Sequence, residues 1–444
     1  MINLEKFLFK KIPLWIYILS IILGLIILSL YGSVVRHVAK GGMMTGKIGL
    51  VAESIAKYPG KIIILLSGYD LDPQPQIFDT NETFILDITN KEIFNTTENG
   101  FLLVSTYNLD GPIIKLFDLK KNETIYSWTP PIKEIRKLTP NQNEGLNVKK
   151  FYRSMHPILF KNGDLAFHSG GGPLVRIDKC NKVEWVADEF YHHSNVLFEN
   201  LIYSTMTKGF YKPSVYLRDV ISIVDSKNGK IKKNIEINRI LKKYLKDNFS
   251  LMYGVGEFER DLFHLNAVYP IRKTDEFFQK GDLVVSLRNL STIFVYRESI
   301  DKIIWLKTGP WINNHDAQYL GNGLFSVFSN NNVRGLEPND FDNLKHSEVY
   351  FYDMKNDISE KPYSKYLKNI KMRSSGLVKV LDVEGRDSII QLNKHGKIIR
   401  VNPETKIWTY QNYLGNNKSG NINWSRYLNR NDIELSFLKN TKCN

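Results

Sequence analysis

A unit of two consecutive β-strand runs recurs along this chain and constrains its fold more than any other feature. Each copy opens with alternating apolar residues, passes through Asp or Asn into a polar turn, and continues into a second strand that often ends in tryptophan. The first apolar residues of the copies are Ile113, Leu174, Val220, Ile293, Val349 and Ile398. Repeats spaced by about 45 to 75 residues are typical of β-propeller blades. The sequence therefore predicts an all-β fold, a six-bladed β-propeller of antiparallel four-stranded blades.

The start of the chain has a different character. Residues 12–35 contain no charged side chain, and three lysines lie among the residues before them. A helix needs about 20 apolar residues to span a bilayer, whereas the apolar part of a cleavable signal peptide has about 7–15. The segment therefore predicts an uncleaved, single-pass transmembrane signal anchor in the cytoplasmic (inner) membrane, with the body of the protein in the periplasm. A buried core helix is the alternative.

These patterns divide the chain into five parts. A membrane-proximal linker or short helix follows the anchor, and the apolar run that begins at Lys61 is expected to form the first strand of the propeller. The polar residues near the C-terminus either close the ring or lie loosely on it. The division is a cytoplasmic N-terminus (1–11), the anchor (12–35), a linker (36–60), the propeller (61–415) and a C-terminal tail (416–444).

The composition of the chain and the spacing of its cysteines and histidines limit which partners and cofactors it can have. The formal net charge is +14, but the lysines are spread along the chain and no nucleic-acid-binding motif is present, so no nucleic-acid partner is predicted. No C-x-x-C or H-E-x-x-H spacing suggests a metal site, and no cofactor is predicted. Cys180 and Cys443 permit at most one disulfide bond, and the sequence does not decide whether they pair. The oligomeric state is left open, a homo-oligomer included.

Histidines stand at corresponding points of several copies of the repeat. His156, His193 and His315 each precede an apolar strand and an asparagine-containing turn, and His264 begins the strand of the intervening copy. If the blades repeat, equivalent histidines should face the same central channel. The alternative is that each histidine merely caps the start of a strand.

An arginine, Arg288, lies between two of these histidines in the sequence. Its guanidinium fork matches the oxygens of a tetrahedral oxyanion, and a histidine beside it could share in holding such a group. A second, neutral imidazole at the same point could attack the group as a nucleophile. Histidines and arginine together are therefore compatible with transfer of an oxyanionic group; the alternative is a scatter of buried polar residues that satisfy backbone groups at strand ends.

The order of these motifs resembles that of a known family. The motifs are H-x-N at 264–266, S-x-R at 286–288, a strand-end tryptophan at 305, and H-D-A at 315–317 followed by N-G at 322–323. In this order they resemble the PAPS-independent arylsulfotransferases (aryl-sulfate sulfotransferases), bacterial enzymes built on a six-bladed β-propeller.

The resemblance is densest over these motifs and extends more loosely from Met155 to Trp408. One departure is Asn289 after the arginine, where the best-studied branch of the family has histidine. That difference bears on the choice of acceptor more than on sulfuryl binding.

The resemblance implies transfer of a sulfuryl group from an aryl sulfate ester to a phenolic acceptor, without a nucleotide donor. It implies that His315 attacks sulfur and becomes a sulfohistidine, while His264 and Arg288 hold the sulfuryl oxygens. His193 would bind the sulfuryl group or transfer a proton. The further residues expected to bind substrate are Asn266, Asp316 and Asn330.

Two other functions remain open. A non-catalytic, membrane-anchored propeller could bind a ligand or act as a scaffold in the cell envelope, because the fold alone decides no function. A third reading keeps the site but uses water as acceptor, so that the enzyme hydrolyses sulfate esters. The set of His264, Arg288 and His315 separates the first alternative from the other two readings, since a scaffold has no need of it.

Overall fold

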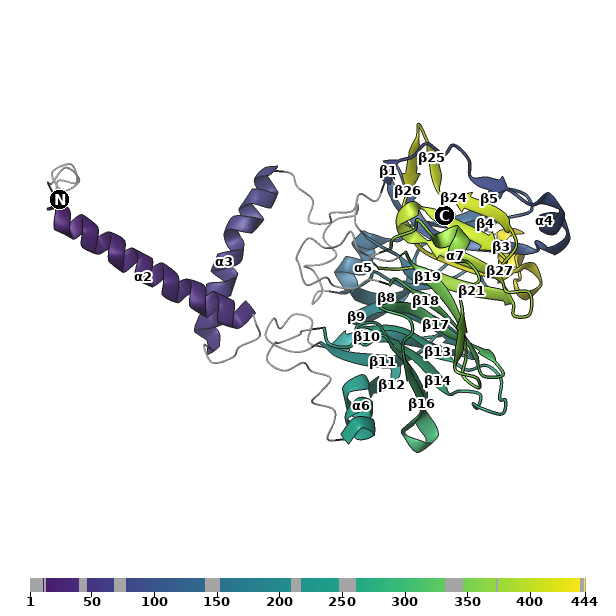
Figure 1. Cartoon of the computed structure of the whole chain (residues 1–444). Helices are drawn as coiled ribbons and strands as arrows, with labels where there is room; N and C mark the ends of the chain where they lie inside the picture. The colour runs from purple at the N-terminus through teal and green to yellow at the C-terminus, as the bar shows by residue number, and fades with distance from the viewer. Residues whose placement is uncertain are drawn as a thin grey trace. The chain divides into compact units, whose positions relative to one another are not determined.

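The computed structural model describes residues 11, 13–39, 46–67, 77–139, 152–208, 217–246, 261–331, 346–372, 374–439 and 443. The chain divides into two units. The first comprises Met1–Pro73, Gly209–Leu217 and Ser250–Arg260, and the second comprises Gln74–Lys208, Arg218–Phe249 and Asp261–Asn444. In Figure 1 the first unit carries two long helices, and the second is built mainly of strands.

The first unit contains α2 (Leu14–Ala39) and α3 (Gly46–Ser67). The side chains of α2 are overwhelmingly apolar and largely exposed, as at Leu28, which is 65% exposed. Within this helix, Leu14–Val38 is 25 residues long and apolar enough to cross a membrane, by length and composition. A membrane anchor and a signal sequence both satisfy that test. The two helices touch where the Tyr31 hydroxyl donates a hydrogen bond to the carbonyl oxygen of Ala52, at 2.8 Å.

Helix α3 corrects one expectation. The segment 36–60 was predicted as a linker or short helix and the apolar run from Lys61 as the first strand, but α3 continues through both, with Pro59 inside it. A short apolar run has the same pattern in a buried strand and in a helix, so periodicity alone does not separate the two.

The second unit holds the strands, all paired antiparallel in sheets (Figure 1). One four-stranded sheet joins the two ends of the unit: β27 (Ile422–Asn429), β3 (Gly100–Asn108), β4 (Gly111–Asp118) and β5 (Glu123–Trp128). A seven-stranded sheet contains β6 (Met155–Leu159), β7 (Leu165–His168), β8 (Gly172–Ile177), β9 (Val183–Phe198), β10 (Leu201–Lys208), β11 (Arg218–Asp225) and β12 (Ile231–Glu236). Two further four-stranded sheets are β13 (Leu265–Pro270), β14 (Leu283–Leu287), β15 (Thr292–Arg297) and β16 (Lys302–Thr308), and β17 (Asn314–Gly321), β18 (Leu324–Ser329), β19 (Glu348–Asp353) and β20 (Ile358–Glu360).

The remaining strands form two smaller groups. β21 (Leu377–Asp382), β22 (Asp387–Leu392), β23 (Lys397–Val401) and β24 (Lys406–Gln411) pair in order, and β2 (Leu86–Ile88) adds to β24. β1 (Ile77–Asp79), β26 (Lys418–Gly420) and β25 (Tyr413–Gly415) make a three-stranded sheet. Short helices connect the strands: α4 (Lys91–Thr97), α5 (Ile132–Leu138), α6 (Ile237–Leu245), α7 (Ser364–Leu367) and α8 (Ser436–Lys439).

The sheets follow one another around a ring, which is the arrangement of a β-propeller. The first strands of successive groups contact one another in the order β27, β6, β9, β13, β17 and β21, and β22 contacts β27 again. β9 is long enough to serve two groups: its first half pairs with β8 and its second half with β10, and both pairings meet at Tyr191. Dividing the seven-stranded sheet at this point gives blades of four strands, but the number of blades stays a prediction.

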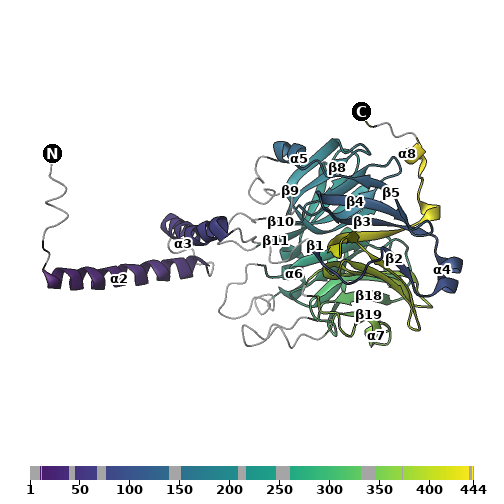
Figure 2. The same cartoon turned by 90° about the horizontal axis from the view of Figure 1, so that it is seen from above.

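The ring is closed by strands from both ends of the unit. β27 pairs with β3 along most of its length, so that yellow and dark blue strands lie side by side in Figure 2. The boundary at 415 is therefore wrong as a structural boundary, because the expected tail 416–444 contributes β27 to this four-stranded sheet. A disulfide bond between Cys180 and Cys443 ties the end of the chain to the turn between β8 and β9. The asparagines and lysines of this region concealed its strand pattern.

The tryptophans that end the repeats pack between neighbouring sheets. Trp128, at the end of β5, is fully buried against Leu165, Phe167 and Val175 of the next sheet. Its indole N–H donates to the carbonyl oxygen of Gly163 at 3.0 Å. Complete burial of a large apolar side chain stabilises a fold by about 1.5–3 kcal/mol. The repeat read from the sequence is therefore the pattern by which adjacent sheets hold together.

Candidate active site

The first strands of the ring are irregular near their beginnings, where histidines and asparagines stand. Register shifts bring one extra residue into β6, β13, β17 and β27 and two into β9. The residues at these shifts include His156, His193, Asn266, His315 and Asn423. A β-bulge redirects a side chain and is common beside active sites. The same irregularity thus recurs where the predicted site residues lie.

Three of the histidines also have an unusual backbone. The φ angles of His156, His193 and His264 are 47°, 55° and 53°. A residue with a Cβ atom adopts this left-handed region at a cost of about 1–3 kcal/mol, and the surrounding structure must hold it there. The same conformation at His156 and His193, both of which lie at a register shift, supports the prediction that these two are equivalent in the blade repeat; in β13 the residue at the shift is Asn266, two residues after His264.

His193 lies at the centre of a group of imidazoles. Its ring centroid is 4.7 Å from that of His264 and 5.5 Å from that of His315. The Nε2 atoms of His193 and His264 are 3.2 Å apart. The structure therefore brings together the three histidines that the sequence singled out as catalytic.

His315 is buried, with 4% of its surface exposed, and its Nδ1 has no hydrogen-bond partner among the described residues. Burial lowers the pKa of His315 to about 3, and the positive charges of Arg288 and His264 act in the same direction. A hydrogen bond with the backbone of Gly376 opposes them. His315 is consequently a neutral imidazole at physiological pH, the form in which the ring can act as a nucleophile.

Arg288 reaches the same place through strand pairing. Its backbone N–H donates to the carbonyl oxygen of His264 at 3.1 Å, which sets the end of β14 beside the start of β13. The guanidinium Nη1 lies 3.4 Å from the Asn289 side-chain oxygen. Because the charge of Arg288 acts on both His315 and Asp261, the guanidinium stands close to the histidine group.

Asn266 links the two strands that carry His264 and His315. It is 1% exposed, and its amide Nδ2 donates to the backbone carbonyl of Asn314 at 3.1 Å. Its Oδ1 is buried without a hydrogen-bond partner among the described residues. Asn266 therefore positions the residue before His315, and a direct contact with substrate stays a prediction.

Asp316 and Asn330 have protein partners, and a contact of either with substrate stays a prediction. The buried carboxylate of Asp316 accepts hydrogen bonds from the Tyr269 hydroxyl, the Gln318 amide and the backbone N–H of Val378. These contacts join β13, β17 and β21, so Asp316 holds first strands together. Asn330 is also buried and donates to the carbonyl oxygen of Ser375 at 2.9 Å.

The structure adds one carboxylate to the site, Asp261, which the sequence did not reveal as a site residue. Asp261 accepts a hydrogen bond from Nδ1 of His264. Burial raises the pKa of Asp261, but the hydrogen bond and charge of His264 outweigh this effect and lower it. A carboxylate on one ring nitrogen fixes the tautomer and orientation of a histidine. Its place three residues before His264 is the sequence signal that could have revealed it.

His168 holds the backbone of His193 through a hydrogen bond. Its Nδ1 accepts from the N–H of Gly170 at 2.9 Å, so Nε2 carries the proton and donates to the backbone carbonyl of His193, also at 2.9 Å. This bond holds the left-handed backbone of His193 in place. His168 ends β7, and nothing in its sequence context distinguishes it from other strand residues.

The rings of His192 and Trp424 also lie beside the histidine group. Nδ1 of His192 is 2.7 Å from Nδ1 of His193, and Nε2 of His192 is 2.6 Å from the Thr207 hydroxyl. Trp424 stacks on His156, with ring centroids 3.3 Å apart, and lies 6.3 Å from His315. Trp424 stands in the segment predicted as a tail, which is why it was missed. Within the described ranges, no three His, Cys, Asp or Glu side chains are placed to hold a metal ion.

Comparison with solved structures gives only distant likenesses. A protein of unknown function from Bacteroides caccae has 11% identity, covers 74% of this chain and 99% of its own, and has a TM-score of 0.47. The Cps50 (Swd1) β-propeller domain of Myceliophteria thermophila has 8% identity, 78% and 89% coverage and a TM-score of 0.36. BamB from Moraxella catarrhalis has 7% identity, 78% and 76% coverage and a TM-score of 0.32. These values carry no argument about function, and no curated protein matches the sequence.

The family comparison is more informative. The model of the arylsulfotransferase (ASST) family matches residues 170–413, which is more than half of the chain. The matched span contains His193, His264, Arg288 and His315, whereas His156 and Trp424 lie outside it. Membership supports aryl sulfotransfer in general as the activity of this chain. The chain belongs to the arylsulfotransferase family.

Proposed function

We propose that this protein transfers a sulfuryl group from an aryl sulfate ester to a phenolic acceptor through a sulfohistidine at His315. The observation that carries the proposal is the group formed by His193, His264 and His315, with the charge of Arg288 beside it. A scaffold has no use for a buried neutral histidine next to an arginine. A sulfuryl-transfer site needs both.

In the first half of the reaction, the lone pair of a neutral His315 ring nitrogen attacks sulfur. The bond between sulfur and the aryl oxygen breaks, and the phenolate leaves with the bonding electron pair. Arg288 and His264 bind the sulfuryl oxygens, where a fixed positive charge stabilises a loose, anionic transition state. His193, which lies within hydrogen-bonding distance of His264, is the group we assign to proton transfer onto the leaving oxygen.

The second half reverses these events with a new phenol. A histidine of the group accepts the phenol proton, the phenolic oxygen attacks sulfur, and the bond between sulfur and His315 breaks. His315 returns to its neutral form. No electron is gained or lost by any partner, so the cycle needs neither a redox cofactor nor a nucleotide.

We further propose that α2 is an uncleaved anchor in the inner membrane and that the sheet unit works in the periplasm. The length and apolar character of α2 support an anchor. The disulfide between Cys180 and Cys443 suits an oxidising compartment. Protease added to spheroplasts should digest the sheet unit, and full protection of that unit would refute this topology.

The activity can be tested with 4-nitrophenyl sulfate. The purified full-length protein should release 4-nitrophenol faster when phenol is added, and phenyl sulfate should form in equal amount. Mixing enzyme with donor alone, followed by peptide mass analysis, should find one sulfuryl group on the peptide that contains His315.

The same experiment separates the remaining alternatives. Release of 4-nitrophenol with inorganic sulfate as the product, unaffected by phenol, would identify a sulfate-ester hydrolase. A sulfuryl group on another histidine would overturn the assignment of the nucleophile.

A further inference from the structure

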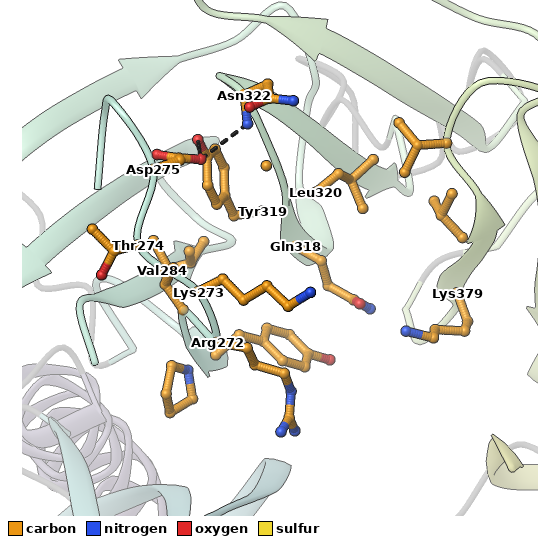
Figure 3. A pocket seen from close by; sticks show the side chains of 16 residues that line it. Arg272, Lys273, Thr274, Asp275, Val284, Gln318, Tyr319, Leu320, Asn322 and Lys379 are labelled. Atoms are coloured by element: carbon orange, nitrogen blue, oxygen red, sulfur yellow. Dashed lines mark hydrogen bonds between the residues drawn. The ribbon is translucent and has the colours of Figure 1, made fainter. Parts of the chain in front are cut away.

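A cavity lies at the other end of the first strands from the histidines. It has a volume of about 500 Å³ and is lined by residues of β13, β17 and β21 and of the segment after β13. Figure 3 shows the side chains of Lys273, Gln318 and Lys379 directed into the same space. Tyr269, which lines this cavity, is five positions after His264 in the chain. At about 3.3 Å per strand residue, that separation is roughly 17 Å.

The charged side chains that line the cavity are mainly cationic: Arg272, Lys273 and Lys379 against one carboxylate, Asp275. Within the described part of the chain, none of the three cations forms an ion pair. Arg272 donates only to a backbone carbonyl, that of Leu197, at 3.1 Å. Cations concentrated in a concave site without protein counter-charges attract an anion.

The carboxylates nearby are already engaged. Asp275 accepts hydrogen bonds from the Tyr319 hydroxyl and from backbone N–H groups of Phe277, Phe278 and Asn322. Asp316, behind the cavity wall, is used by the bonds that join the first strands. The pKa of Lys379 is lowered by burial and then by the charges of Arg272 and Arg426, with Asp316 acting in the opposite direction. Positive charge therefore exceeds negative charge around this ammonium group.

Gln318 adds a feature that discriminates between anions. Both hydrogens of its amide nitrogen are used, one on Asp316 Oδ2 at 3.0 Å and one on the carbonyl oxygen of Val378 at 2.9 Å. Because both partners are acceptors, the orientation of the amide is fixed, and its oxygen remains to accept a proton. Hydrogen phosphate carries such a proton at neutral pH, whereas sulfate does not.

We propose that this cavity binds a phosphate-class oxyanion that carries a proton, with Lys273, Lys379 and Arg272 on its oxygens and the Gln318 oxygen accepting its O–H. The site is distinct from the histidine group and does not depend on the proposed sulfuryl transfer. Free inorganic phosphate shares this chemistry at neutral pH, and a phosphate monoester shares it in its monoanionic form, which is well populated near its second pKa of about 6.

Titration calorimetry at constant ionic strength tests the proposal. The titrants are inorganic phosphate, methyl phosphate and sulfate at about pH 6, where the first two carry a proton and sulfate does not. Each is run on the parent and on Arg288→Met, which disables the anion contact of the histidine site. We expect phosphate to bind Arg288→Met as it binds the parent at this cavity. Sulfate should bind there at least tenfold more weakly, because it lacks the proton that Gln318 accepts.

The controls separate charge at this site from charge in general. Lys379→Met should weaken phosphate binding about tenfold or more, and Lys379→Arg should keep most of it. Lys302→Met removes an equivalent exposed charge at the start of β16, outside the cavity, and should leave the affinity unchanged. Binding of methyl phosphate would identify a monoester as an acceptable source, and binding of inorganic phosphate alone would identify the free ion. The proposal is overturned if sulfate binds Arg288→Met as tightly as phosphate does, or if Lys379→Met binds like the parent.

Discussion

Acidification should destabilise this protein through His168. The residue is fully buried, and burial lowers its pKa from 6.5 to about 4. The unfolded chain therefore binds a proton at a higher pH than the folded chain does, so this contribution to stability is present above pH 6.5 and is lost as the pH falls. With these two pKa values, His168 alone makes the protein about 1.3 kcal/mol less stable at about pH 5.5 than at about pH 7.5.

His168→Gln isolates this contribution. The glutamine oxygen can accept from Gly170 and its amide can donate to His193, so both hydrogen bonds of the imidazole have a counterpart, but the side chain does not titrate. Urea unfolding of parent and variant at both pH values gives the free energies. The loss between the two pH values should be smaller in the variant by about 1.3 kcal/mol. Equal losses in the two proteins would refute the argument, whatever the stability of the variant at neutral pH.

Three further substitutions test the site and the fold. His315→Asn should lower the sulfuryl-transfer rate by orders of magnitude while thermal unfolding stays near that of the parent, and wild-type transfer would exclude the covalent step. Arg288→Lys should also reduce kcat strongly, because a point charge cannot reproduce the fork that holds two oxygens; kinetics equal to the parent's would show that the fork is dispensable. Glu98→Ala should cost about 1–3 kcal/mol by urea unfolding, since it leaves the buried Trp408 indole without its acceptor at 2.8 Å and leaves Arg400 with Asp387 as its remaining carboxylate. A loss below about 1 kcal/mol would mean that the buried ion pair adds little.

Part of the fold could be predicted because the strand pattern of one sheet recurs along the sequence. The alternation of apolar residues and the tryptophan at a strand end identify sheets that pack on one another, and Trp128 is found in that role. The N-terminal helix could likewise be read from an uninterrupted apolar run. The strand β27 could not, because the alternation of apolar and polar residues in Ile422–Asn429 breaks at Ser425 and Arg426, within a region rich in asparagine. Its place in the sheet depends on pairing with β3, more than 300 residues away in the chain.

The residues of the candidate site likewise fall into those that the sequence could reveal and those that it could not. His193, His264 and His315 were recognisable because each precedes an apolar run of the repeat, and a ring of blades brings such positions together. His168 and Trp424 could not be recognised in this way, because they reach the site across strands and from the opposite end of the chain.

The register shifts in the first strands connect the fold to the chemistry. A regular strand would send alternate side chains to opposite faces of the sheet, and neighbouring positions could not serve one site. At β9 the shift allows the rings of His192 and His193, adjacent in sequence, to lie 4.9 Å apart. At β17 the shift at His315 lets it reach the histidine group while Asp316 next to it joins the first strands. The propeller thus supplies rigid, repeated strands, and the bulges decide which of their side chains meet.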